Sequence, residues 1–350
     1  MSLEKLAVPP GESTPYIIES HGGETMTLPG TKSSIRILAS SMETDGKMSV
    51  FHMDGVTGDP AGWHFHNKAH DVFLCTQGQM IVSAGEEARV LSPGDFAYVP
   101  PKVIHQPQLI GPYNETVGLV TPGDWIDFFR FISADYNGVL APEFDNTDVM
   151  ASMFPKFREI KEKYDVVFTP GYQGGEVTEW TVEDSKLPES SQAYFLKANT
   201  GPRYLLGGVL SRPFITTKQS DGQFAVTSIE SSNRFDNPIL GGGFAFTNTH
   251  QVYYIHDGAI QITVQGKTSE VRPGESVFVP AGSETVIVFL DKYVRFWAYS
   301  SGDGLETLIS QGGDPWKGVI VPDEAPAVDD AKVKSAAAAL HVTISSASKL

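Results

Sequence analysis

The sequence predicts an all-β protein built from two copies of one antiparallel β-barrel, with short helices in the linker between them. The main observation is an internal repeat. Pro93–Pro100, "PGDFAYVP", recurs as Pro273–Pro280, "PGESVFVP", and Gly78 recurs as Gly258, both at an offset of 180 residues. The second observation is local composition. Short segments rich in Val, Ile, Phe, Tyr and Thr are interrupted by Gly and Pro, which is typical of an antiparallel sandwich or barrel.

We expect the first barrel to occupy residues 1–145 and the second to occupy residues 191–325. Within each barrel a hairpin is predicted to turn at the repeated glycine, which follows Asp257 in the second copy, and Asp-Gly is a strong turn signal. Near the start of the chain, "PYIIES" from Pro15 resembles "AYFLKA" from Ala193, which extends the repeat to a further strand.

Residues 146–190 are expected to form a linker with helices. Roughly residues 123 to 190 change character: "WIDFFRFIS" and "DVMASMFPKFREIKEKYDVV" have helical spacing and mixed charge, so short helices are predicted in this range, packed on the outside of the barrels. Residues 326–350 are expected to form a C-terminal tail. The single Cys75 lies in a strand-like apolar run, "VFLCTQG", and is interpreted as a buried structural thiol.

The charge balance restricts the partners. The formal net charge is -16, so the chain offers no basic surface for nucleic acid or for an anionic membrane. No apolar run reaches the roughly 18 residues of a membrane span, and "MSLEKLAVPP" lacks the features of a secretory signal. We therefore expect a soluble, intracellular protein that acts on a small molecule.

The segment "WHFHNKAHD" gathers three histidines and an acid within nine residues. Side chains at i and i+2 of a strand share a face, so His64 and His66 point the same way and can bind one ion together. His105 follows 39 residues after His66. Asp71 supplies the carboxylate closest in sequence, although His70 beside it is an alternative ligand. Three imidazoles and a carboxylate suit iron, manganese, nickel, cobalt, copper or zinc.

The second copy offers an internal comparison. At the offset of 180 residues, the positions of the four candidate ligands are occupied by Phe244, Phe246, Gln251 and Thr285. The C-terminal barrel is therefore expected to lack the metal ligands. A displaced site near His250 and His256 is an alternative.

These motifs resemble those of the cupin superfamily, and the duplication resembles a bicupin, or double jelly-roll. Between about residues 15 and 300 the layout is similar to the quercetin 2,3-dioxygenase group, through "PYIIESHGGE", "SQAYFLKANTGPRYLLGG" and "DGQFAVTSIE". The resemblance implies one divalent metal ion per chain, held by His64, His66 and His105. Asp71 stands where the family has a glutamate, so its shorter side chain can ligate, bind through a water or act only from behind the ligands. A homodimer is also implied.

The resemblance further implies a metal-dependent dioxygenase that cleaves a flavonol, or a related enolisable aromatic ketone, with dioxygen and releases carbon monoxide. Asp71 would be the catalytic base, with a pKa raised toward working pH. The candidate substrate-binding residues are Phe51, Trp63, Phe73, Met80, Tyr98 and Ile104. One alternative is a metal-dependent enzyme acting on another diketone or phenol, and another is a non-catalytic, pirin-like bicupin. Oxalate-type decarboxylases are a weaker match, because they too prefer glutamate where Asp71 stands.

The chain ends in Ser348-Lys349-Leu350, which matches the peroxisomal address S-K-L. A peroxisomal location is therefore expected, with the import receptor as a partner. A cytoplasmic location is the alternative.

Overall fold

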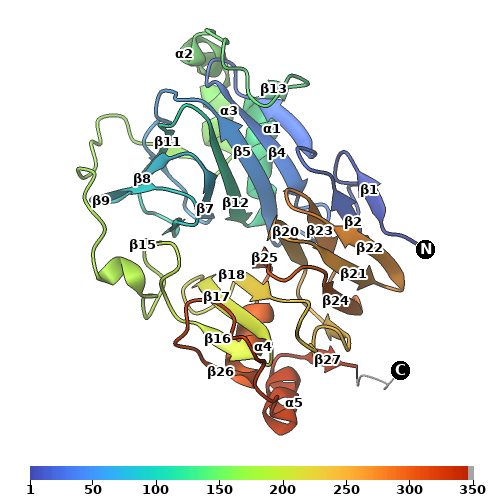
Figure 1. Ribbon diagram of the computed structural model, residues 1–350. Coiled ribbons are helices and arrows are strands. Elements are labelled where there is room, and N and C mark those ends of the chain that lie inside the picture. Colours follow the sequence, from blue (N-terminus) through green and yellow to red (C-terminus); the bar gives the residue numbers. More distant parts are fainter. Residues whose placement is uncertain (346–350) are drawn as a thin grey trace. The chain divides into compact units, whose positions relative to one another are not determined.

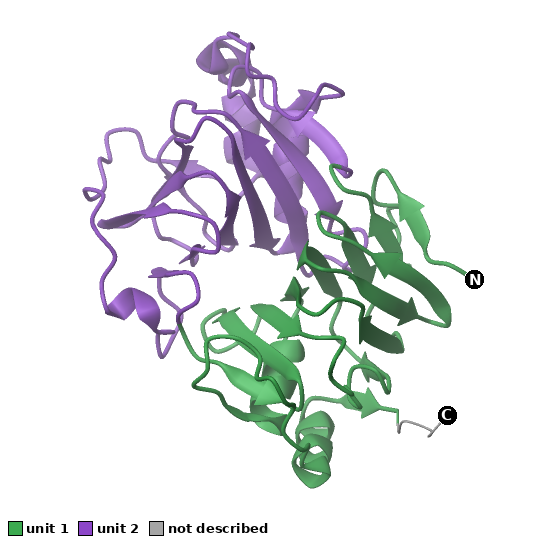
Figure 2. Ribbon diagram, viewed as in Figure 1, with its two compact units in different colours: residues 1–21, 201–350 green, residues 22–200 purple. Residues whose placement is uncertain are grey.

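The computed structural model describes residues 1–345, so the tripeptide Ser348–Leu350 lies outside the described residues. The chain forms two compact units (Figure 1, Figure 2). Unit 2 is Gly22–Thr200, whereas unit 1 combines Met1–His21 with the chain from Gly201 onward. The described residues include no helix that is long and apolar enough to cross a membrane.

Unit 2 contains two sheets. The larger has eight strands in the order β13 (Ala134–Asp135), β3 (Glu24–Thr27), β4 (Ser33–Ala39), β5 (Ser49–Gly55), β12 (Asn114–Thr121), β7 (His70–Gln77), β10 (Phe96–Val99), β15 (Tyr194–Leu196). The smaller has five in the order β14 (Val167–Phe168), β6 (His64–Phe65), β11 (His105–Leu109), β8 (Met80–Ala84), β9 (Glu87–Leu91). Its helical segments are η1 (Gly123–Ile126), α1 (Asp127–Ile132), α2 (Val149–Met153), η2 (Phe154–Lys156), α3 (Phe157–Lys163) and η3 (Glu183–Ser185).

Unit 1 repeats this plan. Its nine-stranded sheet has the order β1 (Glu4–Leu6), β2 (Tyr16–Ile18), β23 (Ser276–Val279), β20 (Gln251–Asp257), β25 (Val294–Ser300), β18 (Ala225–Ser231), β17 (Val209–Ile215), β16 (Tyr204–Leu206), β26 (Asp314–Pro315). Its five-stranded sheet has the order β22 (Lys267–Val271), β21 (Ile260–Val264), β24 (Thr285–Phe289), β19 (Phe244–Phe246), β27 (Val342–Ile344). The helices are α4 (Leu305–Gly312) and α5 (Asp330–Ala339). The predicted duplicated all-β fold is confirmed.

The repeated segments "PYIIES" and "AYFLKA" exchange places between the repeats. The first forms β2, which pairs with β23 in the second repeat, so that Tyr16 lies opposite Phe278. The second forms β15, which pairs with β10 in the first repeat, so that Tyr98 lies opposite Tyr194. Each added strand satisfies the backbone groups of a sheet edge. The units therefore differ from the expected boundaries, because the first 21 residues pack with the second barrel.

The linker is part of unit 2, and its helices bury one face in the core of that unit. Met153 of α2, Ile160 of α3 and the following Val166 belong to the buried core that also holds Phe51 and Trp125. β14 adds a fifth strand to the smaller sheet by pairing with β6. Apolar side chains at the helical spacing predicted the helices, but not the face on which they pack.

The expected C-terminal tail also contains ordered elements. Asp329 caps α5 by accepting hydrogen bonds from the backbone N–H groups of Ala331 and Lys332. Val333 is buried in the core of unit 1, and β27 pairs with β19. Residues up to 345 thus complete the second barrel, so the expectation of a tail from residue 326 is wrong for them.

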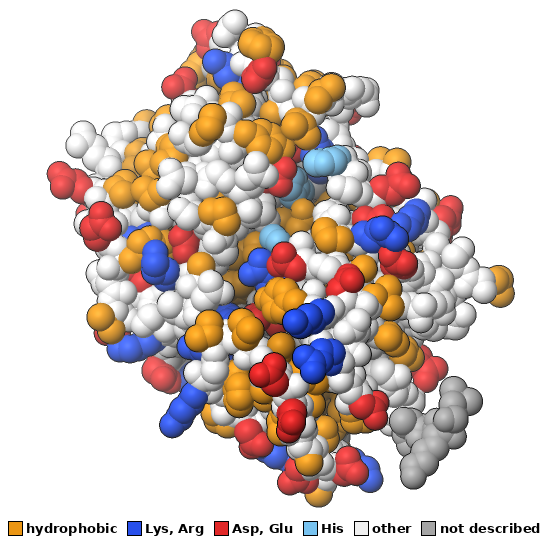
Figure 3. Space-filling model, in the orientation of Figure 1, with side chains coloured by type: hydrophobic (Ala, Val, Ile, Leu, Met, Phe, Trp, Pro, Cys, Tyr) orange, Lys and Arg blue, Asp and Glu red, His pale blue; other side chains and the backbone are white. Residues whose placement is uncertain are grey.

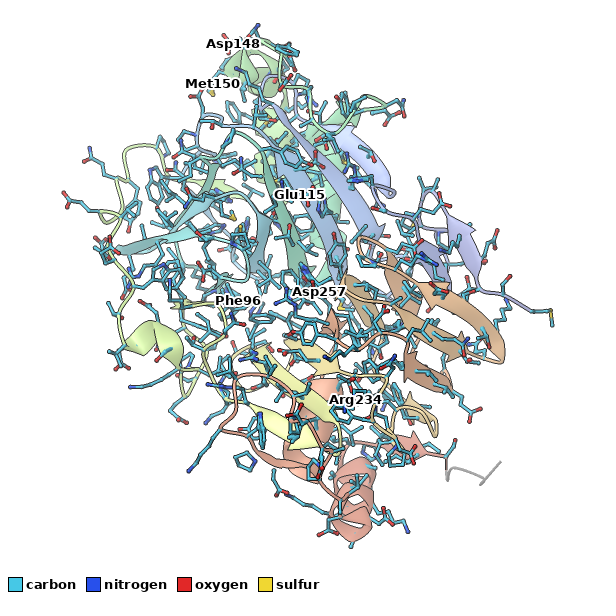
Figure 4. The ribbon with its side chains drawn as sticks, in the orientation of Figure 1. Phe96, Glu115, Asp148, Met150, Arg234 and Asp257 are labelled. Carbon is cyan, nitrogen blue, oxygen red and sulfur yellow. The ribbon has the colours of Figure 1, made fainter. Side chains whose placement is uncertain are left out.

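One end of unit 2 carries apolar side chains on its surface. Asp148 caps α2 by accepting a hydrogen bond from Ala151 N at 3.1 Å, while Met150 beside it is exposed (Figure 4). Phe144 and Phe154 flank this helix and are exposed as well. Figure 3 shows hydrophobic side chains at the surface in the region where Figure 1 places α2.

Candidate metal centre

Three histidines meet on the smaller sheet of unit 2. His64 on β6 lies directly opposite His105 on β11, and their ring centres are 4.3 Å apart. His66 follows β6, and its ring centre lies 5.1 Å from each of the other two. The ligand atoms of the three side chains all lie within 4.8 Å of one another. The shared face that the spacing of His64 and His66 predicts is therefore present, and strand pairing adds His105.

Each imidazole has its Nδ1 atom beside a backbone carbonyl. His64 Nδ1 lies 2.6 Å from Gly62 O, and His105 Nδ1 lies 3.0 Å from Val103 O. His66 Nδ1 lies 2.5 Å from Asp165 O. A carbonyl oxygen only accepts, so these contacts favour the tautomer in which Nδ1 carries the proton, although Trp125 Nε1 also lies 3.3 Å from His66 Nδ1. In the neutral imidazoles this leaves the Nε2 lone pairs for an ion, which is the usual arrangement of metal-binding histidines.

Asp71, rather than His70, faces the histidine cluster. Asp71 Oδ2 lies 3.0 Å from His105 Nε2 and 3.1 Å from His66 Nε2. Neighbouring strand residues point to opposite faces, and His70 accordingly places its Nδ1 atom 2.7 Å from the Tyr98 hydroxyl on the other side of β7. Of the two candidates for a fourth ligand, Asp71 therefore lies beside two of the three imidazoles, those of His66 and His105.

The groups of the cluster shift one another's pKa values in different directions. Burial would raise the pKa of Asp71, but the charge of His66 and hydrogen bonds from His105 and His66 hold it well below its usual range. This direction is opposite to the raised pKa expected of a base. Burial lowers the pKa of His66, but the charge of Asp71 and its hydrogen bond outweigh that effect and raise it. Burial, with His105 and His66, lowers the pKa of His64 to about 3.

The donor set fits a transition metal ion. The three imidazoles converge, two of them buried, and an ionised carboxylate adjoins them. Nitrogen ligands with one carboxylate suit the first-row divalent metals, whose identity this ligand set does not select. Among residues 1–345, His64, His66 and His105 form the one group of three or more His, Cys, Asp or Glu side chains whose ligand atoms lie close enough together to hold an ion.

Of the six candidate substrate-binding residues, Phe73 has a ring contact with the cluster. It is on the same face of β7 as Asp71, half-buried, with its ring centre 6.5 Å from that of His105. Tyr98 lies with His70 on the opposite face of the sheet, so its assignment to this pocket is wrong. Its neighbours Ala97 and Val99 belong to the core cluster that also holds Cys75 and Met80.

The other four candidates have different surroundings. Phe51 belongs to the core cluster that includes Trp125, and Met80 belongs to a second core cluster. Trp63 is half-buried and packs edge-on against Tyr172, with ring centres 5.1 Å apart. Ile104 is half-buried in the turn before β11. A substrate-binding role for these four residues stays a prediction.

Three residues of the site escaped the sequence reasoning. The ring of Phe168 on β14 lies 6.1 Å from that of His64, and the ring of Trp125 lies 4.9 Å from that of His66. Asp165 contacts His66 through its carbonyl. Trp125 lies in the predicted helical segment "WIDFFRFIS" and the other two lie in the segment interpreted as linker, so all three are about 60 to 100 residues from the histidines that they contact. The signal available in the sequence was an aromatic residue in or near a run with helical spacing, and this pattern does not predict which residues the aromatic ring contacts.

The second repeat has neither a histidine nor a carboxylate at the corresponding positions. Phe244 lies opposite Thr285, in the register in which His64 lies opposite His105. The rings of Phe244 and Phe246 contact each other at 6.0 Å. Gln251 accepts a hydrogen bond from Tyr253 at 3.0 Å. Phenylalanine offers no ligand atom, so the site of unit 2 has no equivalent at these positions.

Comparisons with known proteins agree with the duplication. A model described as a cupin domain matches residues 51–115, and one described as an AraC-like ligand binding domain matches residues 243–349. A quercetin 2,3-dioxygenase of Bacillus subtilis is 24% identical over 319 residues, covering 91% of this chain and 92% of that protein. A quercetin 2,3-dioxygenase of Aspergillus japonicus is 24% identical over 290 residues, covering 74% of this chain and 81% of that protein.

Solved structures show the same fold. The protein Ylba from E. coli has a TM-score of 0.53 at 12% identity, covering 83% of this chain and 92% of that chain. A variant of oxalate decarboxylase from B. subtilis has a TM-score of 0.51 at 16% identity, covering 84% of this chain and 80% of that chain. At these identities the likeness concerns the fold alone, so the chemistry has to be argued from the side chains of the histidine cluster.

Proposed function

This chain is a bicupin that resembles the quercetin 2,3-dioxygenases, and from this premise we propose that it is a metal-dependent dioxygenase. Its substrate is a flavonol or a related enolisable aromatic ketone, which it cleaves with dioxygen and release of carbon monoxide. The observation that carries the proposal is the convergence of three imidazoles in unit 2, with the Asp71 carboxylate beside two of them. The two relatives with quercetin 2,3-dioxygenase names support the choice of substrate.

His64, His66 and His105 would hold the metal ion through Nε2. A bound divalent ion supplies Lewis acidity that favours ionisation of an enol hydroxyl, and it brings the reactants together. Asp71 would take the proton of that hydroxyl on Oδ2. Its position 3.0 Å from His105 Nε2 places this oxygen within hydrogen-bond reach of groups at the cluster.

Aromatic side chains on two sides of the cluster suit a flat aromatic substrate. Phe73 adjoins His105, and Phe168 adjoins His64. Rings of this kind contribute large contact areas and keep water away from the reacting atoms. We propose that these two residues flank the bound ketone.

The test is incubation of the metal-loaded protein with quercetin in air, while flavonol absorbance and carbon monoxide in the headspace are followed. The proposal predicts loss of the flavonol together with carbon monoxide in equal amounts. The variant His64→Ala, His66→Ala should show neither. His21→Asn is the matched control, because His21 is exposed and Asn tolerates the positive φ of 60° found there.

The two alternatives correspond to two other results. A protein that binds metal but releases no carbon monoxide from any flavonol contradicts the proposal and favours another diketone or phenol. The shorter Asp71 motivates that reading. A protein that binds metal and turns over no such compound favours a non-catalytic bicupin.

The homodimer stays a prediction of the family resemblance. Light scattering on the eluting protein gives its mass directly, and the expected value is twice the 38.0 kDa of one chain.

A further inference from the structure

Asp165 joins the segment before β14 to the loop that follows His66. Its Oδ1 atom accepts from Asn67 N at 2.7 Å and from Asn67 Nδ2 at 3.0 Å. Its Oδ2 atom accepts from Lys68 N at 2.7 Å and from Ala69 N at 3.2 Å. One carboxylate thus holds three consecutive backbone amides, and it does so immediately beside a proposed metal ligand.

The backbone carbonyl of the same residue contacts the ligand itself. Asp165 O accepts from His66 Nδ1 at 2.5 Å, and it also lies 3.4 Å from Trp125 Nε1. The backbone of His66 is held as well, because Lys102 N donates to His66 O at 2.6 Å. The side chain of Asp165 therefore restrains the loop, while its carbonyl fixes which nitrogen of His66 carries the proton.

The second repeat provides a comparison within the same chain. Phe168 lies opposite His64 in the first repeat, and Ile344 lies opposite Phe244 in the second. Asp165 stands three residues before Phe168, and His341 stands three residues before Ile344. In the second repeat the corresponding loop is held by the backbone carbonyl of His341, which accepts from Thr247 N at 3.3 Å and from Thr247 Oγ1 at 2.7 Å.

The carboxylate is therefore absent from the repeat in which phenylalanines replace His64 and His66. A backbone carbonyl is enough to hold this loop in place, as the His341 carbonyl does in the second repeat. The additional charged acceptor occurs where an imidazole has to be held in one orientation. Hydrogen bonds from backbone N–H groups to a carboxylate are roughly twice as strong as neutral ones, so they restrain the loop well.

We propose that Asp165 is a positioning residue of the metal site, which holds His66 in the orientation that presents Nε2 to the ion. Loss of its carboxylate lowers metal affinity about 10- to 100-fold, as is typical for partners that stand behind metal ligands. This inference rests on the metal site of the proposed function and is independent of the flavonol chemistry.

The test uses the full chain, stripped of metal and titrated with Co²⁺ in competition with a chelator. Asp165→Ala should weaken Co²⁺ binding about 10-fold or more and should change the visible absorption of the bound ion. The control is Asp145→Ala. Asp145 also accepts backbone amides, from Gly30 at 2.7 Å and Thr147 at 2.9 Å, but not at the histidine cluster. It should retain the Co²⁺ affinity and spectrum of the unmodified chain.

A second variant covers the case in which Asp165→Ala does not fold. Asn67→Ala removes one of the four hydrogen bonds at an exposed residue, and it should weaken Co²⁺ binding in the same direction by a smaller factor. Unchanged Co²⁺ affinity and absorption in either folded variant would overturn the positioning role. If the unmodified chain binds no Co²⁺, this result contradicts both the metal site and the positioning role of Asp165. A chain that binds Co²⁺ but cleaves no flavonol leaves the positioning role intact.

Discussion

Asp71 Oδ2 lies 3.1 Å from His66 Nε2, the ring atom that is left free to bind an ion once Nδ1 donates to a carbonyl. The carboxylate is thus close enough either to ligate the ion or to accept a proton at it. These two roles predict different losses on substitution.

Asp71→Ala should keep the metal on the three histidines and lower turnover by about 10²- to 10⁴-fold, the usual contribution of a general base. Metal content and carbon monoxide release, measured on the same sample, separate the two effects. Asp71→Glu restores a carboxylate one methylene longer and should recover part of the turnover. Unaltered turnover in Asp71→Ala would remove this residue from the mechanism, and loss of metal would identify it as a ligand.

A single site per chain is the second prediction. Elemental analysis of untagged protein should find about one transition ion per chain, and this measurement also identifies the metal, which the ligand set does not select. His64→Ala with His66→Ala should abolish binding, since two of three converging imidazoles are lost. Two ions per chain would show that the second barrel binds metal elsewhere, for example near His250.

The ligand set could be predicted because a strand alternates its faces. His64 and His66 share a face at a spacing of two, and the repeat then identified the positions in the second barrel that lack ligands. The contribution of Asp165 could not be predicted, because it depends on the pairing of β14 with β6 across about 100 residues. A short strand of two residues inside a helical linker has no recognisable pattern.

Tyr98 shows why the face of a strand can be misassigned. All four residues of β10 are buried, so the run has no alternation of apolar and polar residues from which to assign a face.

The exchange of β2 and β15 between the repeats could not be predicted for a similar reason. Their likeness revealed the repeat, but a strand sequence does not state which sheet edge it will cover.

The packing of Phe51 provides a stability prediction. A Cβ atom at Gly118 of β12 would lie 2.5 Å from Cζ of the Phe51 ring on β5. The φ of Gly118 is not in the left-handed region, so space alone makes glycine necessary here. Gly118→Ala should lower the free energy of unfolding by about 1–3 kcal/mol, as is usual for overpacking in a core.

Urea unfolding of Gly118→Ala, Phe51→Leu and the double variant gives the coupling between the two sites. The smaller leucine should relieve the clash, so the double variant should be more stable than the sum of the single losses predicts. Strict additivity would show that the ring of Phe51 does not occupy this space.

The C-terminal tripeptide predicts a location. A fluorescent fusion that ends in Ser348-Lys349-Leu350 should enter peroxisomes, and deletion of the three residues should leave it in the cytosol. Activity of the purified protein should be unchanged by the deletion, because the address is read by a receptor. A cytosolic fusion with the tripeptide intact would contradict the prediction.

Glu306 provides a pH dependence. It is buried on α4, where its Oε1 atom accepts from Gly304 N at 3.0 Å and from Thr307 Oγ1 at 2.8 Å. Burial raises the pKa of Glu306 from 4.5 to about 7, against these hydrogen bonds. The folded state thus holds a proton that the unfolded state releases between these values. The contribution of Glu306 to stability is therefore most favourable below pH 4.5, falls as the pH rises and is fully lost above about pH 7.

Glu306→Gln should remove this dependence, because the amide keeps the accepting oxygen and cannot ionise. Each unit of pKa corresponds to about 1.4 kcal/mol, so the variant should gain on the order of 3 kcal/mol over the unmodified chain above neutral pH. The difference in unfolding free energy, measured in urea from about pH 5 to 8, should grow with pH. Glu12→Gln, at an exposed residue, should show no such growth. A difference for Glu306→Gln that stays constant across this range would mean that Glu306 is ionised in the fold and stabilised by partners inside the second barrel.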